Sequence, residues 1–414
     1  CWPLMRILYV VQRYGDGIVG GSETACRQFA EQLAGRGHEV SVLTSCARNY
    51  VDWADEYPPG TEQLNGVTVT RLPVVERRVA SDFDPVHSWM MRHPRLAPRA
   101  DQIRWARLMG PRLAGQREWL TRHAHEFDVT VFMTYLYSTT TEGLPTVAGR
   151  TPTILQPTAH DEPAAYVDWF VSLFRQPDAF LFFTPEEREI VRRLYRVETP
   201  GQVAGIGVAR APVVRNPDTL ITSMGLQKNK YLVYVGRIDE SKGVGELLRF
   251  FRAFRSRTDS DLKLVLVGEA VMDTGDDPAV VIAGFLSEED KASIISQSLA
   301  LVQPSYFESF SIVLCEAWRN ARPALVQGKC AVLRGQALRS NGALPYEGFA
   351  EFEACLAWLT QNPALADEMG AAGHDYVERN YEWDVVLRRF EETAELAKAR
   401  FRTRAAITAP RISG

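Results

Sequence analysis

Two glutamates, Glu308 and Glu316, have a spacing that would let them hold two parts of one extended ligand; they lie in the run YFESFSIVLCEAW. If a helix begins near Ser311, Glu308 lies in the loop before it and Glu316 in its second turn. Eight helical positions span about 12 Å and return to nearly the same face. The backbone N–H groups of Ser309, Phe310 and Ser311 would then lie at a helix N-terminus, where a phosphate is stabilised. Hydroxyls, two phosphates and a ribose in series match a nucleoside diphosphate sugar. The alternative is two solvated glutamates on an amphipathic helix.

Positive charge for such a ligand would come from a second run, YLVYVGRIDESKG. Tyr231–Val235 is apolar and rich in β-formers, so it is predicted to be a buried strand that Gly236 ends. Arg237 and Lys242 follow at the carboxyl edge, where open parallel sheets bind ligands. A planar guanidinium and a compact ammonium both suit a diphosphate. The alternative is that Arg237 is a surface salt-bridge partner.

Four motifs that run in order along nearly the whole chain resemble the GT-B retaining glycosyltransferases, and within them the large family 4 (GT4). They are GGSETACRQFAEQLAGRGHEVSVLTS, PTAHDEP, YVGRIDESKG and ESFSIVLCEAW. The resemblance implies an α/β fold of two Rossmann-like, doubly wound parallel-sheet domains that face each other across a cleft. It also implies transfer, with retention of configuration, of a sugar from a UDP- or GDP-linked donor to a hydroxyl acceptor. No metal and no cofactor besides the nucleotide sugar are expected.

The same resemblance implies four catalytic positions. Arg237 and Lys242 match residues that grip the donor diphosphate, and Glu308 matches a residue that contacts the donor sugar. His160, in the run AHDE, matches a histidine near the acceptor and the anomeric carbon. A structural histidine in a loop is the alternative for His160, because histidine often serves that purpose.

The predicted donor-binding set adds residues from three other places. Glu316 matches the position that holds the ribose hydroxyls, and Phe285 is expected to contact the base. The glycines of the first loop match a segment in which backbone approaches the donor phosphate or the acceptor. The full set is Gly20, Gly21, Phe285, Ser309, Phe310, Ser311 and Glu316.

One stretch departs from the family pattern. Many members carry a G-x-P and then a GG-x-x-E loop after the second glutamate. Here residues 321–346 have Ala321 at the first glycine and contain no GG-x-x-E. The departure affects the contacts expected around the donor sugar. It does not affect the contacts that Arg237 and Lys242 are predicted to make with the diphosphate.

Short apolar runs alternate with helical patterns along the chain, which favours parallel sheets. We predict an acceptor-side domain over residues 1–212 and a donor-binding domain over residues 213–382. The proline-rich stretch 209–230 is interpreted as the linker between them. By resemblance, a last helix at about 383–408 packs back onto the first domain.

Composition indicates a globular protein without a membrane span. The chain is 46% hydrophobic and 24% charged, and its net charge of -4 argues against a nucleic-acid partner. No apolar run approaches the length of about 18 residues that a transmembrane helix needs. The six cysteines are scattered and form no C-x-x-C pair, as expected for reduced thiols in the cytoplasm. We therefore expect a cytoplasmic protein, and the family resemblance implies an enzyme of polysaccharide or glycoconjugate biosynthesis.

The segment 87–125 combines many arginines with tryptophans and few acids. Such a surface could bind an anionic acceptor, or contact the inner face of the membrane peripherally. The alternative is a helical insertion whose tryptophans pack inward and whose arginines are solvated. The residues concerned are Arg92, Arg95, Arg99, Arg104, Arg107, Arg112, Arg117 and Arg122, with Trp89, Trp105 and Trp119 among them. The acceptor could be a glycan, a lipid-linked sugar or a small molecule.

Other signals suggest competing functions. Gly15, Gly17 and Gly20 match G-x-G-x-x-G, so an NAD-dependent oxidoreductase is a second hypothesis. Three residues between strand and first glycine, and a second strand without a terminal acid, argue against it. Asp82 and Asp84 form a D-x-D, which we interpret as a turn rather than a metal site. A GT-B protein that epimerises or merely binds a sugar nucleotide is a third hypothesis.

Overall fold

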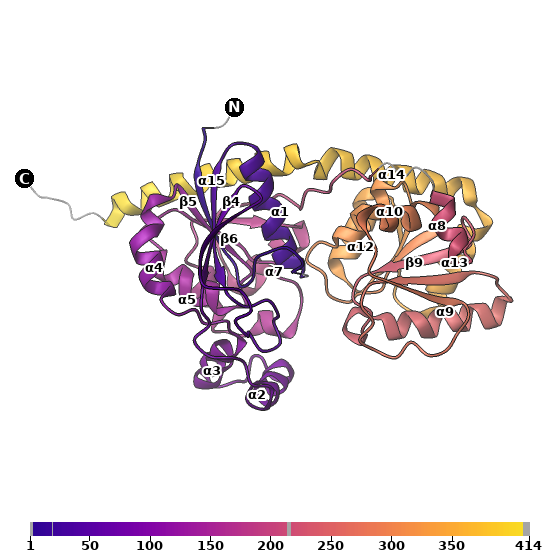
Figure 1. Cartoon of the computed structure of the whole chain (residues 1–414), viewed down its shortest axis with the longest axis horizontal. Coiled ribbons are helices and arrows are strands. Elements are labelled where there is room, and N and C mark those ends of the chain that lie inside the picture. Colours follow the sequence, from indigo (N-terminus) through magenta and orange to yellow (C-terminus); the bar gives the residue numbers. More distant parts are fainter. Residues whose placement is uncertain (1–2, 19, 213–216, 409–414) are drawn as a thin grey trace, which may run out of the picture. The chain divides into compact units, whose positions relative to one another are not determined.

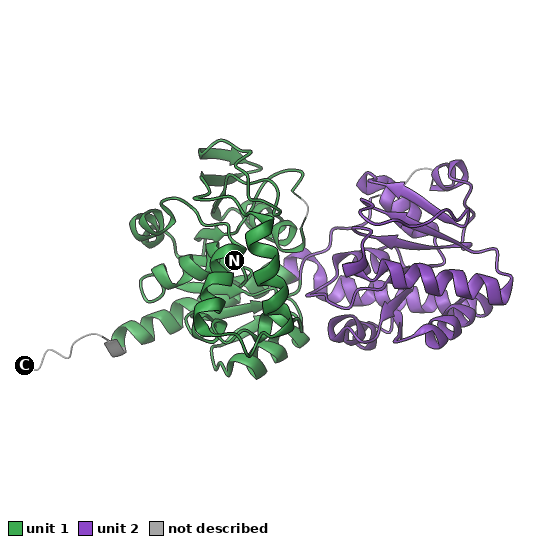
Figure 2. Cartoon of the chain, turned by 90° about the horizontal axis from the view of Figure 1, so that it is seen from below, with its two compact units in different colours: residues 1–205, 386–414 green, residues 206–385 purple. Residues whose placement is uncertain are grey.

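The computed structural model describes residues 3–18, 20–212 and 217–408 (Figure 1). The chain forms two compact units, coloured separately in Figure 2. Unit 1 comprises residues 1–205 and 386–414, and unit 2 comprises residues 206–385. The division falls between Gly205 and Ile206, whereas the sequence placed a boundary near Pro212. Residues 213–216, where the predicted second domain begins, lie outside the described residues.

Unit 1 is built on an eight-stranded sheet with the order β3-β4-β2-β1-β5-β6-β7-β8. All neighbours are parallel except β3, which pairs antiparallel with β4. Apolar runs fill the central strands, and Ile7 to Val10 are fully buried, as expected where helices cover both faces. The order reverses between β1 and β5. The strands are β1 (Arg6–Val10), β2 (Glu39–Ser45), β3 (Gly60–Leu64), β4 (Val67–Leu72), β5 (Val129–Met133), β6 (Thr153–Gln156), β7 (Ala179–Phe182) and β8 (Gly201–Val203).

The helices of unit 1 follow from local sequence signals. Thr184 caps α7 by accepting a hydrogen bond from the Glu187 N–H, and Pro185 takes the first helical position. Figure 1 shows α2 and α3 beyond one end of the sheet. The helices are α1 (Gly21–Gly35), α2 (Ala80–Arg92), α3 (Arg99–Met109), α4 (Gln116–His123), η1 (Ala124–Glu126), α5 (Ser138–Val147), η2 (Pro163–Tyr166), α6 (Phe170–Phe174) and α7 (Pro185–Tyr195).

Unit 2 is built on a six-stranded parallel sheet with the order β11-β10-β9-β12-β13-β14. The chain moves outward from β9 to β11, then returns and moves outward on the other side from β12. The strands are β9 (Tyr231–Val235), β10 (Lys263–Val267), β11 (Val280–Gly284), β12 (Ala300–Gln303), β13 (Ala324–Gln327) and β14 (Ala343–Tyr346). The helices are α8 (Pro217–Ser223), η3 (Glu240–Lys242), α9 (Val244–Thr258), α10 (Glu288–Gln297), α11 (Ile312–Arg319), α12 (Ala331–Ser340), α13 (Phe349–Gln361) and α14 (Pro363–Tyr381).

The last helix, α15 (Trp383–Thr408), belongs to unit 1 from Val386 onward. The Phe390 ring lies 6.2 Å from the Tyr9 ring, centroid to centroid. Glu391 accepts from buried His38 at 3.2 Å. Towards the end of the helix, Arg404 Nη1 lies 3.1 Å from the buried Asp178 carboxylate. Apolar packing and buried charge pairs together hold this segment on unit 1.

Two sequence-based interpretations were wrong. The stretch 209–230 was interpreted as a linker, but residues 217–223 form α8, which packs against α10. The predicted turn at Asp82 and Asp84 lies instead within α2, where Asp82 occupies the first helical turn and suits the helix dipole. Within the described residues, no helix combines the length and apolar character needed to cross a bilayer.

Candidate functional site

The predicted donor residues of unit 2 gather where its strand order reverses. Arg237 and Lys242 follow β9, and Glu308 follows the adjacent parallel strand β12. Sequential strands diverge from this point, so the loops at their carboxyl ends leave a crevice between them, which is where open α/β sheets bind ligands.

The loops after β9 and β12 touch each other closely. Gly243 has a φ of 77°, and a Cβ there would lie 2.4 Å from the Pro304 carbonyl oxygen. A side chain would therefore be both strained and obstructed. This contact sets Lys242 beside the second loop, and its Nζ lies 3.1 Å from Glu308 Oε1. The lysine side chain is 39% exposed and the glutamate 15%. Two residues that the resemblance implied to be catalytic thus form one ion pair.

Arg237 is held by a neighbour that the sequence analysis missed, Asp239. The Asp239 carboxylate pairs with Arg237 Nε, and its other oxygen accepts from the Ser241 hydroxyl at 2.6 Å and the Lys242 N–H at 2.9 Å. Burial alone would raise the pKa of Asp239, but these hydrogen bonds hold it below its ordinary value. An aspartate three residues before Lys242 is an N-cap signal that could have revealed this role.

The loop before α11 differs slightly from the prediction. The helix begins at Ile312, so Ser311 is its N-cap residue and Ser309 and Phe310 precede it. Ser311 has a φ of 68° and accepts a hydrogen bond from Gln303 at 3.0 Å. The Phe310 side chain is buried, and its ring makes an edge contact with Tyr381. Phe310 therefore anchors the loop, while the helix N-terminus that favours a phosphate starts after Ser311.

Glu316 lies in the second turn of α11, as predicted, but it pairs with Lys291 of α10 rather than with Arg237 or Lys242. Lys291 Nζ lies 3.0 Å from Glu316 Oε1 and 2.8 Å from Glu288. Burial raises the pKa of Glu316, and the attraction of Lys291 opposes that rise. The second oxygen, Oε2, is buried and accepts no hydrogen bond from any described residue. Lys291 was missed because a lysine three positions after a glutamate resembles a surface helix pair.

Phe285 directly follows β11, so it lies at the same carboxyl edge as the other donor residues of unit 2. Its side chain is 72% exposed. An aromatic ring of that exposure has no packing role in the unit itself and is available to stack on a base.

In unit 1, the predicted glycines lie over a buried ion pair. Gly20 is the N-cap residue of α1, and a Cβ there would lie 2.3 Å from Glu23 Oε2. The Glu23 carboxylate accepts from Arg13 Nε at 2.9 Å and from the Ser22 hydroxyl at 2.8 Å. A Cβ on Gly21 would meet nothing within 4 Å. Gly20 is therefore required by packing, whereas Gly21 leaves its surroundings open.

The G-x-G-x-x-G match does not form the tight turn of a dinucleotide site. β1 ends at Val10 and α1 begins at Gly21, so the three glycines lie in a long connection. The tight strand-to-helix turn is what brings a helix N-terminus to a pyrophosphate. The geometry therefore disfavours the NAD hypothesis.

His160 lies in the loop after β6, beside Glu162. Its Nδ1 is 3.6 Å from Glu162 Oε2, and the histidine side chain is 25% exposed. Glu162 Oε1 accepts a hydrogen bond from the buried Tyr135 hydroxyl at 3.2 Å. The separation between His160 and Glu162 exceeds hydrogen-bond distance, so Glu162 lies close to the imidazole without a hydrogen bond that would fix its orientation.

A buried carboxylate that the sequence analysis missed, Glu187, supports the His160 loop. Glu187 Oε1 accepts from the Ala159 N–H at 2.8 Å, and Oε2 accepts from the Phe183 N–H at 2.6 Å. Burial raises the pKa of Glu187 to about 8, although these backbone donors act to lower it. Thr184 and Glu187 have the T-x-x-E spacing of a capping box, so the signal for a cap was present. The second contact, with Ala159, depends on the tertiary fold.

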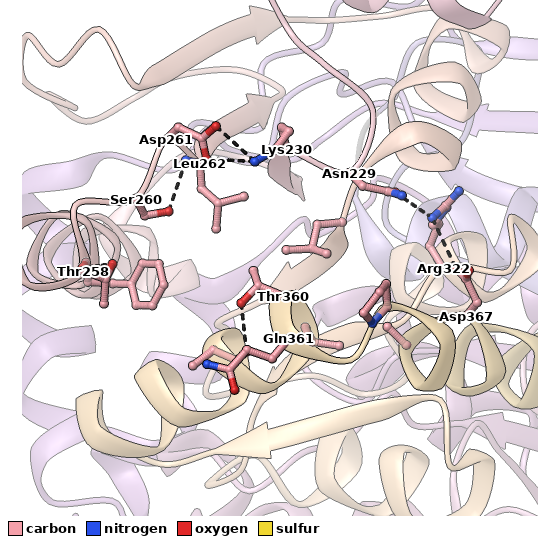
Figure 3. Close-up of a pocket in the computed structure, with 16 residues that line it drawn as sticks. Asn229, Lys230, Thr258, Ser260, Asp261, Leu262, Arg322, Thr360, Gln361 and Asp367 are labelled. Atoms are coloured by element: carbon pink, nitrogen blue, oxygen red, sulfur yellow. Dashed lines mark hydrogen bonds and ion pairs between the residues drawn. The ribbon is translucent and has the colours of Figure 1, made fainter.

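A cavity of about 380 Å³ in unit 2 lies away from these residues (Figure 3). Four of its polar lining residues, Asn229, Lys230, Asp261 and Arg322, shortly precede strands at the amino edge of the sheet, and others come from α9, α13 and α14. Lys230 pairs with Asp261, and Arg322 donates to Asn229. Because doubly wound sheets bind ligands at the carboxyl edge, this cavity is not the candidate site. Among the described residues, no group of three or more His, Cys, Asp or Glu side chains is arranged to hold a metal ion.

The chain is similar to known glycosyltransferases in sequence and in structure. Residues 221–374, within unit 2, match the family described as Glycosyl transferases group 1. The glycogen synthase of Mycobacterium tuberculosis is 23% identical over 418 residues, covering 92% of each chain. Sucrose-phosphate synthase from Thermosynechococcus elongatus superposes with a TM-score of 0.67 at 17% identity, covering 95% of this chain and 99% of that one. Anabaena HepE, solved in complex with UDP, gives 0.69 at 14% identity, covering 94% and 100%.

These similarities establish the fold class that the sequence predicted, two doubly wound α/β units of the GT-B type. The relatives also indicate a glycosyltransferase, since the family match covers the unit in which Lys242, Glu308 and Glu316 lie.

Proposed function

We propose that this protein is a metal-independent, retaining glycosyltransferase that moves a sugar from a nucleoside diphosphate sugar to a hydroxyl acceptor. Unit 2 binds the donor and unit 1 supplies the acceptor side. The observation that carries the proposal is the Lys242–Glu308 ion pair at the strand-order reversal of a glycosyl transferases group 1 domain. It puts a cation for a diphosphate next to a carboxylate for sugar hydroxyls.

Donor binding would exchange the partners of this ion pair. Pairs as exposed as Lys242 are worth about 0–1 kcal/mol, so a diphosphate can displace Glu308 from the ammonium at little cost. The freed carboxylate then accepts hydrogen bonds from the sugar, and those bonds are strong because one partner is ionised. The unliganded pair therefore keeps both side chains in place without occupying the site permanently.

Cleavage of the anomeric C–O bond leaves negative charge on the diphosphate. Lys242 and Arg237 would stabilise that charge, together with the N-terminus of α11. The pairing of Arg237 with Asp239 fixes the guanidinium before the ligand arrives, so little reorganisation is needed during the reaction.

Glu316 and Phe285 would hold the nucleoside. The buried Oε2 of Glu316 lacks a hydrogen-bond donor among the described residues, and a ribose hydroxyl is a donor of the required kind. The exposed Phe285 ring would stack on the base. UDP is the first nucleotide to test, because HepE, a structural neighbour, was solved with UDP.

Retention would follow from attack of the acceptor on the face that the diphosphate leaves, with the leaving phosphate taking the acceptor proton. That route needs no covalent nucleophile. His160, which lies beside Glu162, would align the acceptor rather than act as a strong base.

Ligand binding is tested first, and turnover is tested second. Thermal unfolding with UDP, GDP and ADP identifies the base, since a ligand at about 100 times its Kd stabilises the native state by about 2.7 kcal/mol. Labelled UDP-sugars are then incubated with and without acceptor. We expect UDP to be released only when an acceptor is present, and the product to keep the anomeric configuration of the donor. EDTA should not lower the activity. Sugar interconversion without acceptor would indicate an epimerase, and binding without turnover would indicate a non-catalytic protein.

The arginine-rich segment bears on the acceptor. Of its three tryptophans, Trp105 is fully buried and Trp119 packs on the unit 1 core, while Trp89 is 37% exposed. Its arginines are largely exposed. A membrane-inserting surface presents several aromatic side chains. We therefore favour an anionic acceptor over peripheral membrane contact for this segment.

A further inference from the structure

A second concave surface, in unit 1, gathers three arginines from two parts of the sequence. It has a volume of about 550 Å³, and its charged lining residues are Arg95, Arg193, Arg196 and Asp168. Arg95 comes from the connection between α2 and α3, within the arginine-rich segment. The other two arginines come from the C-terminal end of α7. Three guanidinium groups and one carboxylate leave the lining with an excess of positive charge.

Local contacts hold the arginines at the rim of this pocket. The Arg95 guanidinium lies over the Tyr166 ring, 4.6 Å from its centroid, a contact that fixes a flexible side chain. Arg193 lies 3.4 Å from Asp161. Arg196 ends α7 with a φ of 50°, and this left-handed residue turns the chain away from the helix. Neither Arg193 nor Arg196 is buried, so both can reach a ligand.

The pocket is continuous with the loop that carries His160. Asp161, the next residue, accepts a hydrogen bond at 2.5 Å from the hydroxyl of Tyr166, which lines the pocket. The loop then runs along α7. Ala159 is bound by Glu187 near the start of the helix, and Ala165 is bound by Tyr195 at its end. Eight helical positions separate these two contacts, which corresponds to about 12 Å.

We propose that this pocket, bounded by Arg95, Arg193 and Arg196, binds a phosphoryl group of the acceptor. Arginine forks match phosphate oxygens bidentately, and a concave site surrounds a small anion better than a flat surface does. The pocket adjoins the His160 loop through Asp161, which contacts both Arg193 and Tyr166. The site therefore selects an acceptor that carries a phosphoryl group in addition to its receiving hydroxyl. The role in transfer rests on the proposed function, whereas phosphate binding by unit 1 does not.

Binding is tested by calorimetric titration with inorganic phosphate in the presence of saturating UDP, which occupies the donor site. If UDP does not bind, the proposed function fails, and the titration is then made on the Arg237→Ala/Lys242→Ala double variant. Arg193→Gln and Arg196→Asn should each weaken phosphate binding about tenfold or more, the scale for losing one charge-assisted hydrogen bond. Asparagine is chosen at position 196 because it tolerates a left-handed backbone.

Arg192→Gln is the matched control, since Arg192 lies on the same helix, is exposed and does not line the pocket. It should change phosphate affinity less than twofold. If all three variants lost phosphate affinity equally, phosphate would be attracted by the overall positive charge of this surface and not by a specific site, which would overturn the proposal. The site would also be overturned if phosphate bound neither to the wild type with saturating UDP nor to the Arg237→Ala/Lys242→Ala double variant.

The source of the phosphoryl group is then identified with two probes. Glucose 6-phosphate is compared with glucose by titration, and sedimentation is measured with vesicles of phosphatidylglycerol. If Arg193→Gln and Arg196→Asn weaken the binding of one phosphorylated probe and Arg192→Gln does not, the site is supported. The probe affected then identifies the source as a soluble sugar phosphate or a lipid phosphate. If neither probe depends on these two arginines, the pocket is not an acceptor site.

Discussion

The candidate residues of the two units are supported in opposite ways. In unit 2 the predicted residues carry charge and pair with a partner across a loop or helix, as Lys242 does with Glu308 and Glu316 with Lys291. In unit 1 the predicted residues lie next to buried carboxylates: Glu23 occupies the space beside Gly20, and Glu187 accepts a hydrogen bond from the N–H of Ala159, which precedes His160. The charged groups are thus the predicted residues themselves in unit 2 and their buried neighbours in unit 1.

The difference fits the ligands proposed for each unit. A nucleoside diphosphate has fixed charge that must be neutralised, so cations at the surface of the crevice are required. The receiving hydroxyl of the acceptor is uncharged, so near His160 what matters is the shape and position of the loop that orients it, while a phosphoryl group of the acceptor would be bound by the arginine-lined pocket. Substitutions in unit 2 should therefore act on turnover or donor affinity, and those beneath the loops of unit 1 on stability.

The largest effect is expected for Lys242→Ala. Removal of one positioned cation from a site of developing negative charge lowers turnover by about 100-fold or more. Turnover is measured with saturating donor and acceptor. Lys228→Ala is the control, because Lys228 is an exposed lysine of the same unit. Wild-type turnover in Lys242→Ala would show that the diphosphate is held elsewhere.

A smaller effect, on affinity, is expected for the Glu316–Lys291 pair. Glu316→Gln should weaken UDP binding about tenfold, the scale for a hydrogen bond to a charged group. Lys291→Met leaves Glu316 without its cation, so the pKa of Glu316 rises further and the carboxyl takes up a proton. UDP binding by Lys291→Met should then be weaker than in the wild type, and its affinity should increase as the pH rises and Glu316 ionises.

Titrations of both variants with UDP between pH 7 and pH 9 check this prediction. Glu288→Gln removes the other, largely exposed partner of Lys291 and should leave the affinity within about twofold. Parallel pH profiles for wild type and Lys291→Met would contradict the role given to Lys291.

What the sequence could predict depended on whether the signal was local. Strands such as Tyr231–Val235 were predictable because apolar β-formers run between breaking residues. The position of Lys242 and Glu308 at the carboxyl edge of the sheet was predictable because each follows a strand in a recognisable motif, and their role towards a donor stays a prediction. Their direct contact was not, because it depends on the approach of Gly243 to Pro304, which lie far apart in sequence.

The residues that were missed each have an ordinary local explanation. Lys291 matches a helix surface pair, and Glu187 completes a capping box with Thr184. Each has a second contact, Lys291 with Glu316 and Glu187 with Ala159, that only the packed unit provides. Similarly, α8 was missed because the prolines around it outweighed a helix whose burial depends on α10.

For Glu187, a pH-dependent stability is expected. Its pKa is raised to about 8 in the native state, so the native protein binds one more proton than the unfolded chain between about pH 4 and pH 8. The free energy of unfolding should therefore fall as pH rises through this range, by up to about 1.4 kcal/mol per pH unit from this group. Glu187→Gln removes that contribution, whereas Glu189→Gln, an exposed substitution on the same helix, retains it. Urea unfolding at pH 5, 6.5 and 8 compares the three proteins, and an identical slope in Glu187→Gln would assign the pH dependence to other groups.

The smallest effect is expected for Cys315→Ala, beside Glu316. Cys315 is fully buried, and burial raises the pKa of its thiol far above the ordinary value. Because the thiolate is the reactive form, this residue cannot serve as a nucleophile near neutral pH. Cys315→Ala should keep turnover within about threefold and lower the free energy of unfolding by about 1 kcal/mol through lost packing. Iodoacetamide should label the partly exposed Cys355 before Cys315, as followed by mass spectrometry. A loss of turnover as large as that of Lys242→Ala would instead require a covalent step in unit 2, and the role of its charge pairs would have to be reassigned.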